Sequence, residues 1–76
     1  MTESGERFID AGEMGCGELV MLLKTTMSEL SPGDRIRVIA LDPGAPVDLP
    51  AWCRLTGHSL ERSEHPEYLI RKKENG

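Results

Sequence analysis

The sequence predicts an α/β (α+β) two-layer sandwich, in which a four-stranded mixed sheet carries two helices on one face. Three observations lead to this fold class. Short segments rich in β-branched residues are typical of strands, and two longer segments carry apolar residues at helical spacing. Clusters of glycine and proline separate these segments, as expected for turns. The resulting order, β-α-β-α-β-β, is typical of a sheet that packs its helices against one face.

The first half of the chain predicts a strand, a helix and a second strand, at residues 7–11, 18–30 and 35–41. Gly12 ends the first strand, and Leu19, Leu23 and Met27 share one face of the helix. The turn at residues 31–34 contains proline and glycine and ends this helix. Because the helix joins the two strands, we expect them to pair in parallel through a right-handed crossover.

The second half of the chain predicts a helix followed by two strands, at residues 48–57, 58–63 and 67–72. Asp48 is predicted to cap the helix, with Pro50 in its first turn and Gly57 at its end. A turn near His65-Pro66 should make the last two strands antiparallel. The tail, residues 73–76, is predicted to be frayed.

The length of the chain, 76 residues, predicts one domain, residues 1–76, with an ordered core at about residues 6–73. A domain of this size buries only about 60% of its unfolded surface. It therefore has no room for a deep, enclosed substrate cavity. A single reactive side chain that is presented to another protein fits this limit.

Charge and composition exclude several functions. The formal charge of −4 argues against direct nucleic acid binding, which requires a basic face. Residues 1–34 carry seven acids and two bases, a net −5, whereas residues 35–76 carry six acids and seven bases, a net +1. The sequence has neither a run of about 18 apolar residues nor the pattern of a signal peptide. We therefore expect a cytoplasmic monomer, with no membrane contact and with both cysteines as free thiols.

Cys16 lies where the first strand should give way to the first helix, in a turn with Gly15 and Gly17. Unpaired N–H groups and the positive end of the helix dipole favour a thiolate there and should lower the pKa of the thiol. Glu18 would lie in the first helical turn, and both Glu13 and Glu18 oppose a second negative charge nearby. Cys16 is therefore either a reactive thiol or a small apolar residue that closes the turn.

Five segments resemble one known family in their order and spacing. They are Ile9 to Val20, Ser31-Pro32-Gly33-Asp34, Asp42-Pro43-Gly44, Asp48-Leu49-Pro50-Ala51-Trp52-Cys53 and Thr56-Gly57-His58. Over roughly residues 7–73 the chain resembles the TusA/SirA family of sulfur carriers, which places Cys-Pro-x-Pro at the start of a helix. The cysteine of that motif falls on Cys16. Its two prolines fall on Gly17 and Leu19, so the motif is degenerate here.

The resemblance implies a two-layer α/β sandwich and a sulfurtransferase that uses no cofactor. Cys16 would accept sulfane sulfur as a persulfide from a cysteine desulfurase or a rhodanese. It would pass the sulfur to a DsrE-like or other relay protein, in tRNA thiolation, cofactor assembly or sulfur metabolism. Because the prolines are absent, the alternative is a non-catalytic interaction or regulatory module that has kept the fold and lost transfer. A thiol redox module using both cysteines is the third hypothesis.

Four other residues are weaker candidates for function. Cys53 shares a helix face with apolar residues, which predicts core packing. The spacing of the cysteines, His58 and His65 matches no zinc pattern, so we expect no metal. Met21 falls on the polar side of the first helix, where it is either a partner contact or an ordinary exposed apolar residue.

Overall fold

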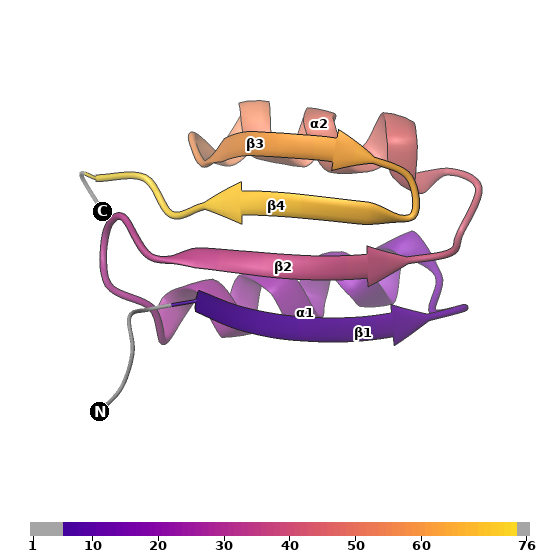
Figure 1. Cartoon of the computed structure of the whole chain (residues 1–76), viewed down its shortest axis with the longest axis horizontal. Helices are drawn as coiled ribbons and strands as arrows, with labels where there is room; N and C mark the ends of the chain where they lie inside the picture. Colours follow the sequence, from indigo (N-terminus) through magenta and orange to yellow (C-terminus); the bar gives the residue numbers. More distant parts are fainter. Residues whose placement is uncertain (1–5, 75–76) are drawn as a thin grey trace.

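The computed structural model describes residues 6–74. Six elements follow one another along the chain, as Figure 1 shows. They are β1 (Glu6–Gly12), α1 (Cys16–Ser28), β2 (Arg35–Ala40), α2 (Ala45–Thr56), β3 (Ser59–Glu64) and β4 (Glu67–Arg71). None of the helices in this part of the chain is long and apolar enough to cross a membrane. The predicted order of elements, β-α-β-α-β-β, is confirmed.

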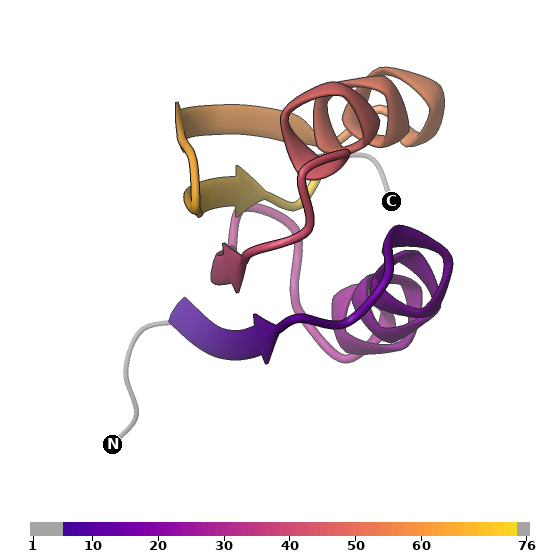
Figure 2. The ribbon, with the colours of Figure 1, turned by 90° about the vertical axis from the view of Figure 1, so that its right-hand side faces the viewer.

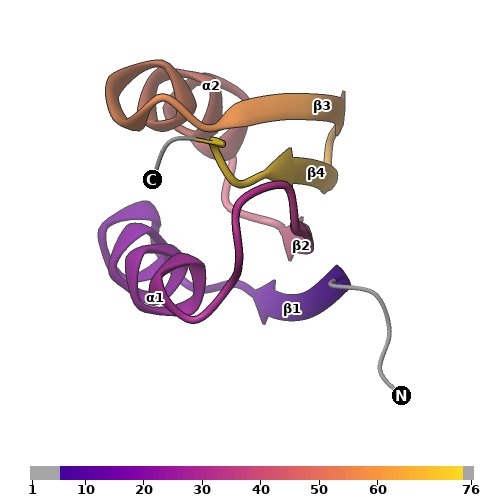
Figure 3. The same ribbon diagram turned by 90° about the vertical axis from the view of Figure 1, so that its left-hand side faces the viewer.

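The four strands form one open sheet with the order β1-β2-β4-β3. β1 and β2 are parallel, whereas β4 is antiparallel to both of its neighbours, β2 and β3. Both helices lie on the same face of this sheet, as the two end-on views show (Figures 2 and 3). The fold is therefore the predicted two-layer sandwich with a mixed sheet, and its parallel pair is the one joined through α1.

The hydrophobic core lies between the sheet and the two helices. Apolar side chains alternate along β2, so that Ile36 and Val38 face the helices and are fully buried. Leu19 and Leu23 from α1 and Leu49 from α2 close over them with no exposed surface. This single apolar layer matches the small core expected of a short chain.

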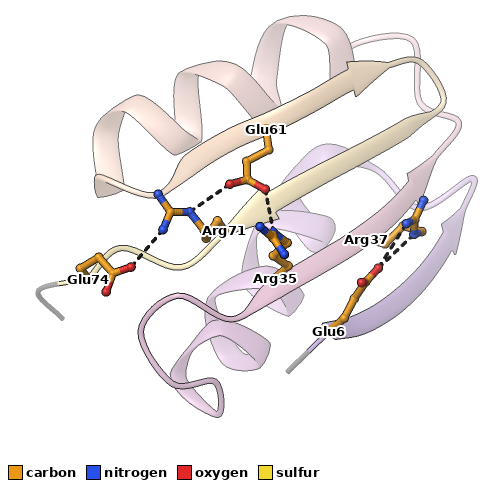
Figure 4. A network of polar contacts seen from close by, with 6 residues as sticks. All are labelled: Glu6, Arg35, Arg37, Glu61, Arg71 and Glu74. Atoms are coloured by element: carbon orange, nitrogen blue, oxygen red, sulfur yellow. Dashed lines mark hydrogen bonds and ion pairs between the residues drawn. The ribbon is translucent and has the colours of Figure 1, made fainter. Parts of the chain in front are cut away.

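The opposite face of the sheet carries ion pairs between strands (Figure 4). Glu61 of β3 accepts from Arg35 Nε at 2.8 Å, and Glu61 Oε2 lies 3.0 Å from Arg71 Nε. Arg37 of β2 pairs with Glu6 of β1 at 3.2 Å. Exposed pairs of this kind contribute little each, about 0–1 kcal/mol. Their main effect is to make this face polar, so that the apolar layer is confined to the helix side.

Both helices begin earlier than the sequence predicts. α1 begins at Cys16, with Gly15 as its N-cap, two residues before the predicted start. α2 begins at Ala45 with Gly44 as its N-cap, so the prediction that Asp48 caps this helix is wrong. Asp48 instead lies in the first turn, where the helix dipole also favours an acid. Pro50 lies inside α2, further from its start than predicted.

The prediction of a frayed tail is wrong for its first two residues, while residues 75–76 lie outside the described part. Lys73 donates its backbone N–H to His58 Nδ1 at 3.0 Å and its ammonium group to the Thr56 carbonyl at 2.9 Å. Glu74 accepts from Arg71 at 2.9 Å. Lys72 likewise donates to the Leu30 carbonyl at 2.7 Å. The tail is therefore fixed across the C-terminal ends of both helices.

Candidate functional site

Cys16 is the first residue of α1 and lies at the edge of the molecule where both helices begin. Figure 2 looks onto this edge. Gly44, the N-cap of α2, passes so close that a Cβ at this glycine would lie 3.8 Å from the Cys16 Sγ. The thiol is half-buried, because its inner side packs against the core while its other side remains accessible. The two helix N-termini and the candidate cysteine therefore share one small region.

Two carboxylates from the second helix and its preceding loop surround the Cys16 thiol. Sγ donates a hydrogen bond to Asp42 Oδ2 over 2.9 Å. The same oxygen accepts the backbone N–H of Gly44 over 3.0 Å, which fixes the carboxylate in place. Asp48 also lies close to the thiol. The Cys16 Sγ and one carboxylate oxygen each of Asp42 and Asp48 form a cluster in which all three atoms lie within 4.8 Å of one another. Neither aspartate was among the site residues predicted from the sequence.

The structure reverses the predicted pKa shift of Cys16. Burial, the hydrogen bonds to Asp42 and Asp48, and the charges of both carboxylates raise the pKa of the thiol from its ordinary value of 9.0 to about 12. Each of these causes acts against the thiolate that the helix dipole alone would favour. The acids near Cys16 in the sequence, Glu13 and Glu18, are not among the causes of this shift. The carboxylates that raise the pKa are those of Asp42 and Asp48, which folding brings next to the Cys16 thiol.

The other predicted site residues surround Cys16 on the solvent side. Gly15 and Gly17 are exposed, and Glu18 is an exposed acid in the first turn of α1. No side chain of the described residues caps the N-terminus of α1. Backbone N–H groups in this first turn therefore lack an intrahelical partner and remain available to an anion. Met21 is 69% exposed, as expected for a partner contact or an isolated surface residue.

Cys53 lies in the interior of α2 and is only 3% exposed, which confirms its predicted core packing. Burial raises the pKa of its thiol to about 11. Both cysteines are free thiols. His58 accepts the Lys73 backbone N–H, and burial, followed by the nearby charges of Lys73 and Lys72, lowers the pKa of its imidazole. Neither Cys53 nor His58 belongs to the cluster around Cys16.

The cluster of Cys16, Asp42 and Asp48 is not assigned to a metal. Its three donors combine a protonated thiol with two carboxylates, and the nearer carboxylate oxygen already accepts two hydrogen bonds. Structural zinc sites generally hold the ion with four ligands, among which thiolates and imidazoles dominate. The prediction that the protein binds no metal stays a prediction.

The surface of the described residues includes a smaller and a larger hollow. A hollow of about 350 Å³ is lined by Glu13, Leu41, Asp42 and Pro43, so it opens beside the carboxylate that holds the thiol. A larger groove of about 720 Å³ runs between the two helices toward their C-terminal ends, with Trp52 and Lys73 among its lining residues. Cys16 itself lines neither hollow, and the smaller one reaches the site only through Asp42.

The place of Asp42 in the sequence, directly after a strand, is a signal for this site. Asp42 follows the end of β2 directly, and Cys16 follows β1 by a short turn. Because β1 and β2 are parallel neighbours, their carboxyl ends meet at the same edge of the sheet. Ligands and reactive groups of α/β sheets collect at this edge. Polar residues that follow adjacent parallel strands were therefore candidates for a shared site.

Comparisons with known proteins agree with this architecture. A family described as "Sulfurtransferase TusA" matches residues 7–72. The chain is 40% identical over 77 aligned positions to the "Sulfur carrier protein TusA" of Pseudomonas aeruginosa (strain LESB58), covering 96% of this chain and 98% of that protein. It is 39% identical to the protein of the same name from Pseudomonas paraeruginosa (strain DSM 24068 / PA7), with the same coverage. The corresponding protein of Pseudomonas putida (strain W619) is also 39% identical, over 90% of both chains.

Proposed function

The chain belongs to the TusA family and is a sulfur carrier, and from this premise we propose that Cys16 carries the sulfur as a persulfide. The observation that supports this assignment is the position of its thiol. Cys16 is an accessible cysteine at the start of a helix, whereas Cys53 is enclosed in the core. A carrier must expose its sulfur to two successive partners, and the position of Cys16 allows this.

The local backbone supports the loaded state. A persulfide is a stronger acid than the corresponding thiol, so a loaded Cys16 carries its negative charge on the terminal sulfur. The N–H groups in the first turn of α1 have no side-chain cap and favour an anion. Because Gly17 has no side chain, its amide is open to approach from solvent. These groups stabilise a sulfur anion that extends outward from Cys16.

Sulfur transfer to Cys16 needs no external oxidant or reductant. The Cys16 sulfur attacks the terminal sulfur of a donor persulfide, a new S–S bond forms, and the S–S bond of the donor breaks. The donor cysteine leaves as a thiolate and takes up the proton that Cys16 has lost. The reverse sequence, with an acceptor cysteine as the attacking group, unloads the carrier. This persulfide relay makes the protein a sulfurtransferase without a cofactor.

The partners in this relay are proteins. We propose a cysteine desulfurase or a rhodanese as the donor and a DsrE-like or other relay protein as the acceptor, within the cytoplasm. Met21 is the proposed partner contact, since it is 69% exposed on the helix that begins with Cys16. Flexible methionine side chains adapt to more than one partner surface. This suits a carrier that must dock to a donor and an acceptor in turn.

Loading by a desulfurase tests this proposal. The protein is incubated with a cysteine desulfurase and cysteine, and its intact mass is measured under non-reducing conditions. We expect an adduct of about 32 daltons, the mass of one sulfur atom, that is absent from Cys16→Ser and retained in Cys53→Ser. An adduct that persists in Cys16→Ser would remove Cys16 from the mechanism.

One observation favours a second function, a non-catalytic interaction module with the same fold. The raised pKa of Cys16, about 12, is what an unreactive thiol would show. For this alternative, the desulfurase leaves no adduct on the native protein, even at alkaline pH where the thiol begins to ionise. The same mass measurement therefore separates the two functions.

A further inference from the structure

Of the two aspartates near Cys16, Asp42 holds the thiol in the shorter contact: Sγ donates to its Oδ2 over 2.9 Å. Its position is fixed from three sides. Oδ2 accepts the Gly44 N–H at 3.0 Å, and the Asp42 carbonyl accepts the Ala45 N–H at 3.0 Å. The residue before it, Leu41, donates its backbone N–H to the Gly12 carbonyl at 2.9 Å. The carboxylate is therefore a rigid acceptor at the place where the thiol hydrogen points.

Loading with sulfur removes the donor from this contact. In the empty carrier Sγ bears a hydrogen, which Asp42 Oδ2 accepts. In the loaded carrier Sγ is bonded to a second sulfur atom and has no hydrogen to donate. The terminal sulfur is an anion that would face the fixed oxygen of Asp42, with the carboxylate of Asp48 also near. Two negative groups at hydrogen-bond distance repel each other, so the contact that holds the empty thiol disfavours the loaded one.

From this geometry, and resting on the proposed persulfide chemistry of Cys16, we propose that Asp42 is a positioning residue. It places the sulfur of Cys16 differently in the empty and in the loaded carrier. It holds the empty thiol inward and protonated, and it drives the loaded sulfur outward. The empty carrier is thereby protected from stray electrophiles and oxidants. The loaded sulfur is displaced toward solvent and the first turn of α1, where an acceptor can reach it.

The charged groups around Cys16 are consistent with this role. Asp48 from α2 adds a second carboxylate, and Glu13 lines the hollow next to Asp42. On the sheet side the pKa of the Tyr68 hydroxyl is raised by burial and then by the charge of Cys16, so it remains a neutral neighbour. The described surroundings of Sγ therefore offer no cation that would offset the carboxylates.

The first test uses the empty carrier and the variant Asp42→Asn. The variant keeps an oxygen that can accept the Gly44 N–H but has lost the charge that opposes the thiolate. We expect iodoacetamide to alkylate its Cys16 about three- to tenfold faster at pH 8, with the midpoint of the pH profile lower by one unit or more. The rate rises by less than the fraction of thiolate does, because a thiolate of lower pKa is a weaker nucleophile.

The matched control for this test is Asp10→Asn. Asp10 also accepts a backbone N–H two residues ahead, from Gly12 at 3.2 Å, yet it makes no contact with the thiol. The control therefore repeats the change of charge and of local turn without changing the acceptor of the thiol. We expect its pH profile to match that of the native protein. Equal profiles for all three proteins would overturn the holding role of Asp42.

The second test uses the loaded carrier. After loading by a desulfurase, the release of sulfane sulfur to cyanide is followed as thiocyanate. The introduced amide can donate a hydrogen bond to the terminal sulfur and hold it inward, away from cyanide. We expect this to outweigh the easier departure of a Cys16 thiolate of lower pKa, so that Asp42→Asn releases its sulfur at least threefold more slowly than the native protein. Equal or faster release would overturn the expulsion step.

The two proposals fail in different ways. If the native protein takes up no sulfur on Cys16, the persulfide function is wrong and the expulsion step is wrong with it. If the native protein loads normally while Asp42→Asn shows an unchanged alkylation profile and unchanged release, only the role of Asp42 is wrong. Circular dichroism of each variant checks that the fold is retained in these comparisons.

Discussion

The start of α1 and the interior of α2 each hold a cysteine whose pKa is raised, but for different reasons. Burial alone raises the pKa of Cys53 to about 11. At Cys16 burial acts together with hydrogen bonds to Asp42 and Asp48, and the pKa reaches about 12 although the side chain is only half-buried. Both thiols therefore resist ionisation, although Cys16 is the more accessible of the two.

This difference shows that a protein can make a thiol unreactive in two ways, by burial or by neighbouring carboxylates. Cys53 becomes reactive only when the core opens, because nothing less removes its burial. Cys16 becomes reactive when the contacts with the two aspartates are lost, which needs only a local change. A partner that places a cation near Asp42 would have this effect, since an opposite charge offsets the carboxylate. Control by a neighbouring charge therefore suits a thiol that must be switched on.

Alkylation by iodoacetamide tests the comparison most strongly. Below pH 9, a pKa of about 12 in place of 9.0 gives Cys16 about a thousandfold less thiolate than an ordinary cysteine. The greater nucleophilicity of a more basic thiolate recovers part of this, so we expect native Cys16 to react about fiftyfold more slowly than in urea. Cys53 should react more slowly still, because it requires unfolding.

Single-thiol variants separate the two rates, with Cys53→Ser reporting on Cys16 and Cys16→Ser on Cys53. The rates are followed by intact mass at pH 8, in buffer and in urea. A native Cys16 that reacts as fast as it does in urea would contradict the raised pKa and, with it, the described contact to Asp42.

Alkaline titration should lower stability through both cysteines, because folding raises the pKa of each thiol. Between pH 9 and 11 the unfolded chain loses the Cys53 proton while the folded chain keeps it, so the free energy of unfolding falls as the pH rises. A shift of this size corresponds to about 2–3 kcal/mol. Urea denaturation at pH 8, 9.5 and 11 measures the decline, and Cys53→Ala should make it less steep by removing the share of Cys53, while Cys16 keeps its own share. Equal slopes for the native protein and Cys53→Ala would show that Cys53 is not a source.

Serine substitutions should separate the two positions by stability at neutral pH. Cys53→Ser places a hydroxyl in the core and should lower the free energy of unfolding by about 1–3 kcal/mol. Cys16→Ser should change it by less than about 0.5 kcal/mol, because the site is half-buried and the hydroxyl can donate to Asp42 as the thiol does. Urea denaturation of both variants checks this, and equal losses would mean that Cys16 is packed as tightly as Cys53.

The arrangement of strands and helices could be predicted from the sequence because it depends on local patterns. Alternation in β2 and helical spacing in α1 are visible in single segments, and the parallel pairing of β1 and β2 follows from the connection between them. The helix starts were harder to predict, because Gly15 and Gly44 cap without a side chain. Asp48 was misleading because an acid is favoured both at an N-cap and in the first turn.

The electrostatics of the site could not be derived from the residues near Cys16. The sequence places glutamates on both sides of it, and neither makes a described contact with the thiol. Asp42, which lies 26 positions away in the chain, supplies the acceptor because β2 ends beside β1. The helix dipole was correctly located, but its effect on the pKa depends on side chains that only the fold brings to the same place.

A small gain in stability is expected at a glycine next to Cys16. Gly17 lies in the first turn of α1, and a Cβ added there would meet nothing within 4 Å. Gly17→Ala should therefore raise the free energy of unfolding by about 0.5–1 kcal/mol, since it removes freedom from the unfolded chain and favours the helix.

Gly57 ends α2 with a φ of +92° and a Cβ position 3.3 Å from Lys73, so Gly57→Ala should instead lower the free energy of unfolding by about 1–2 kcal/mol.

Thermal or urea denaturation measures both changes, and a loss of stability in Gly17→Ala would show that its backbone needs a glycine. A gain would mean that no packing contact requires the glycine that replaces the first family proline. The lack of a side chain next to the sulfur would then have another cause. In the persulfide mechanism, that cause is the open approach to the Gly17 amide, which a proline would remove along with the N–H itself.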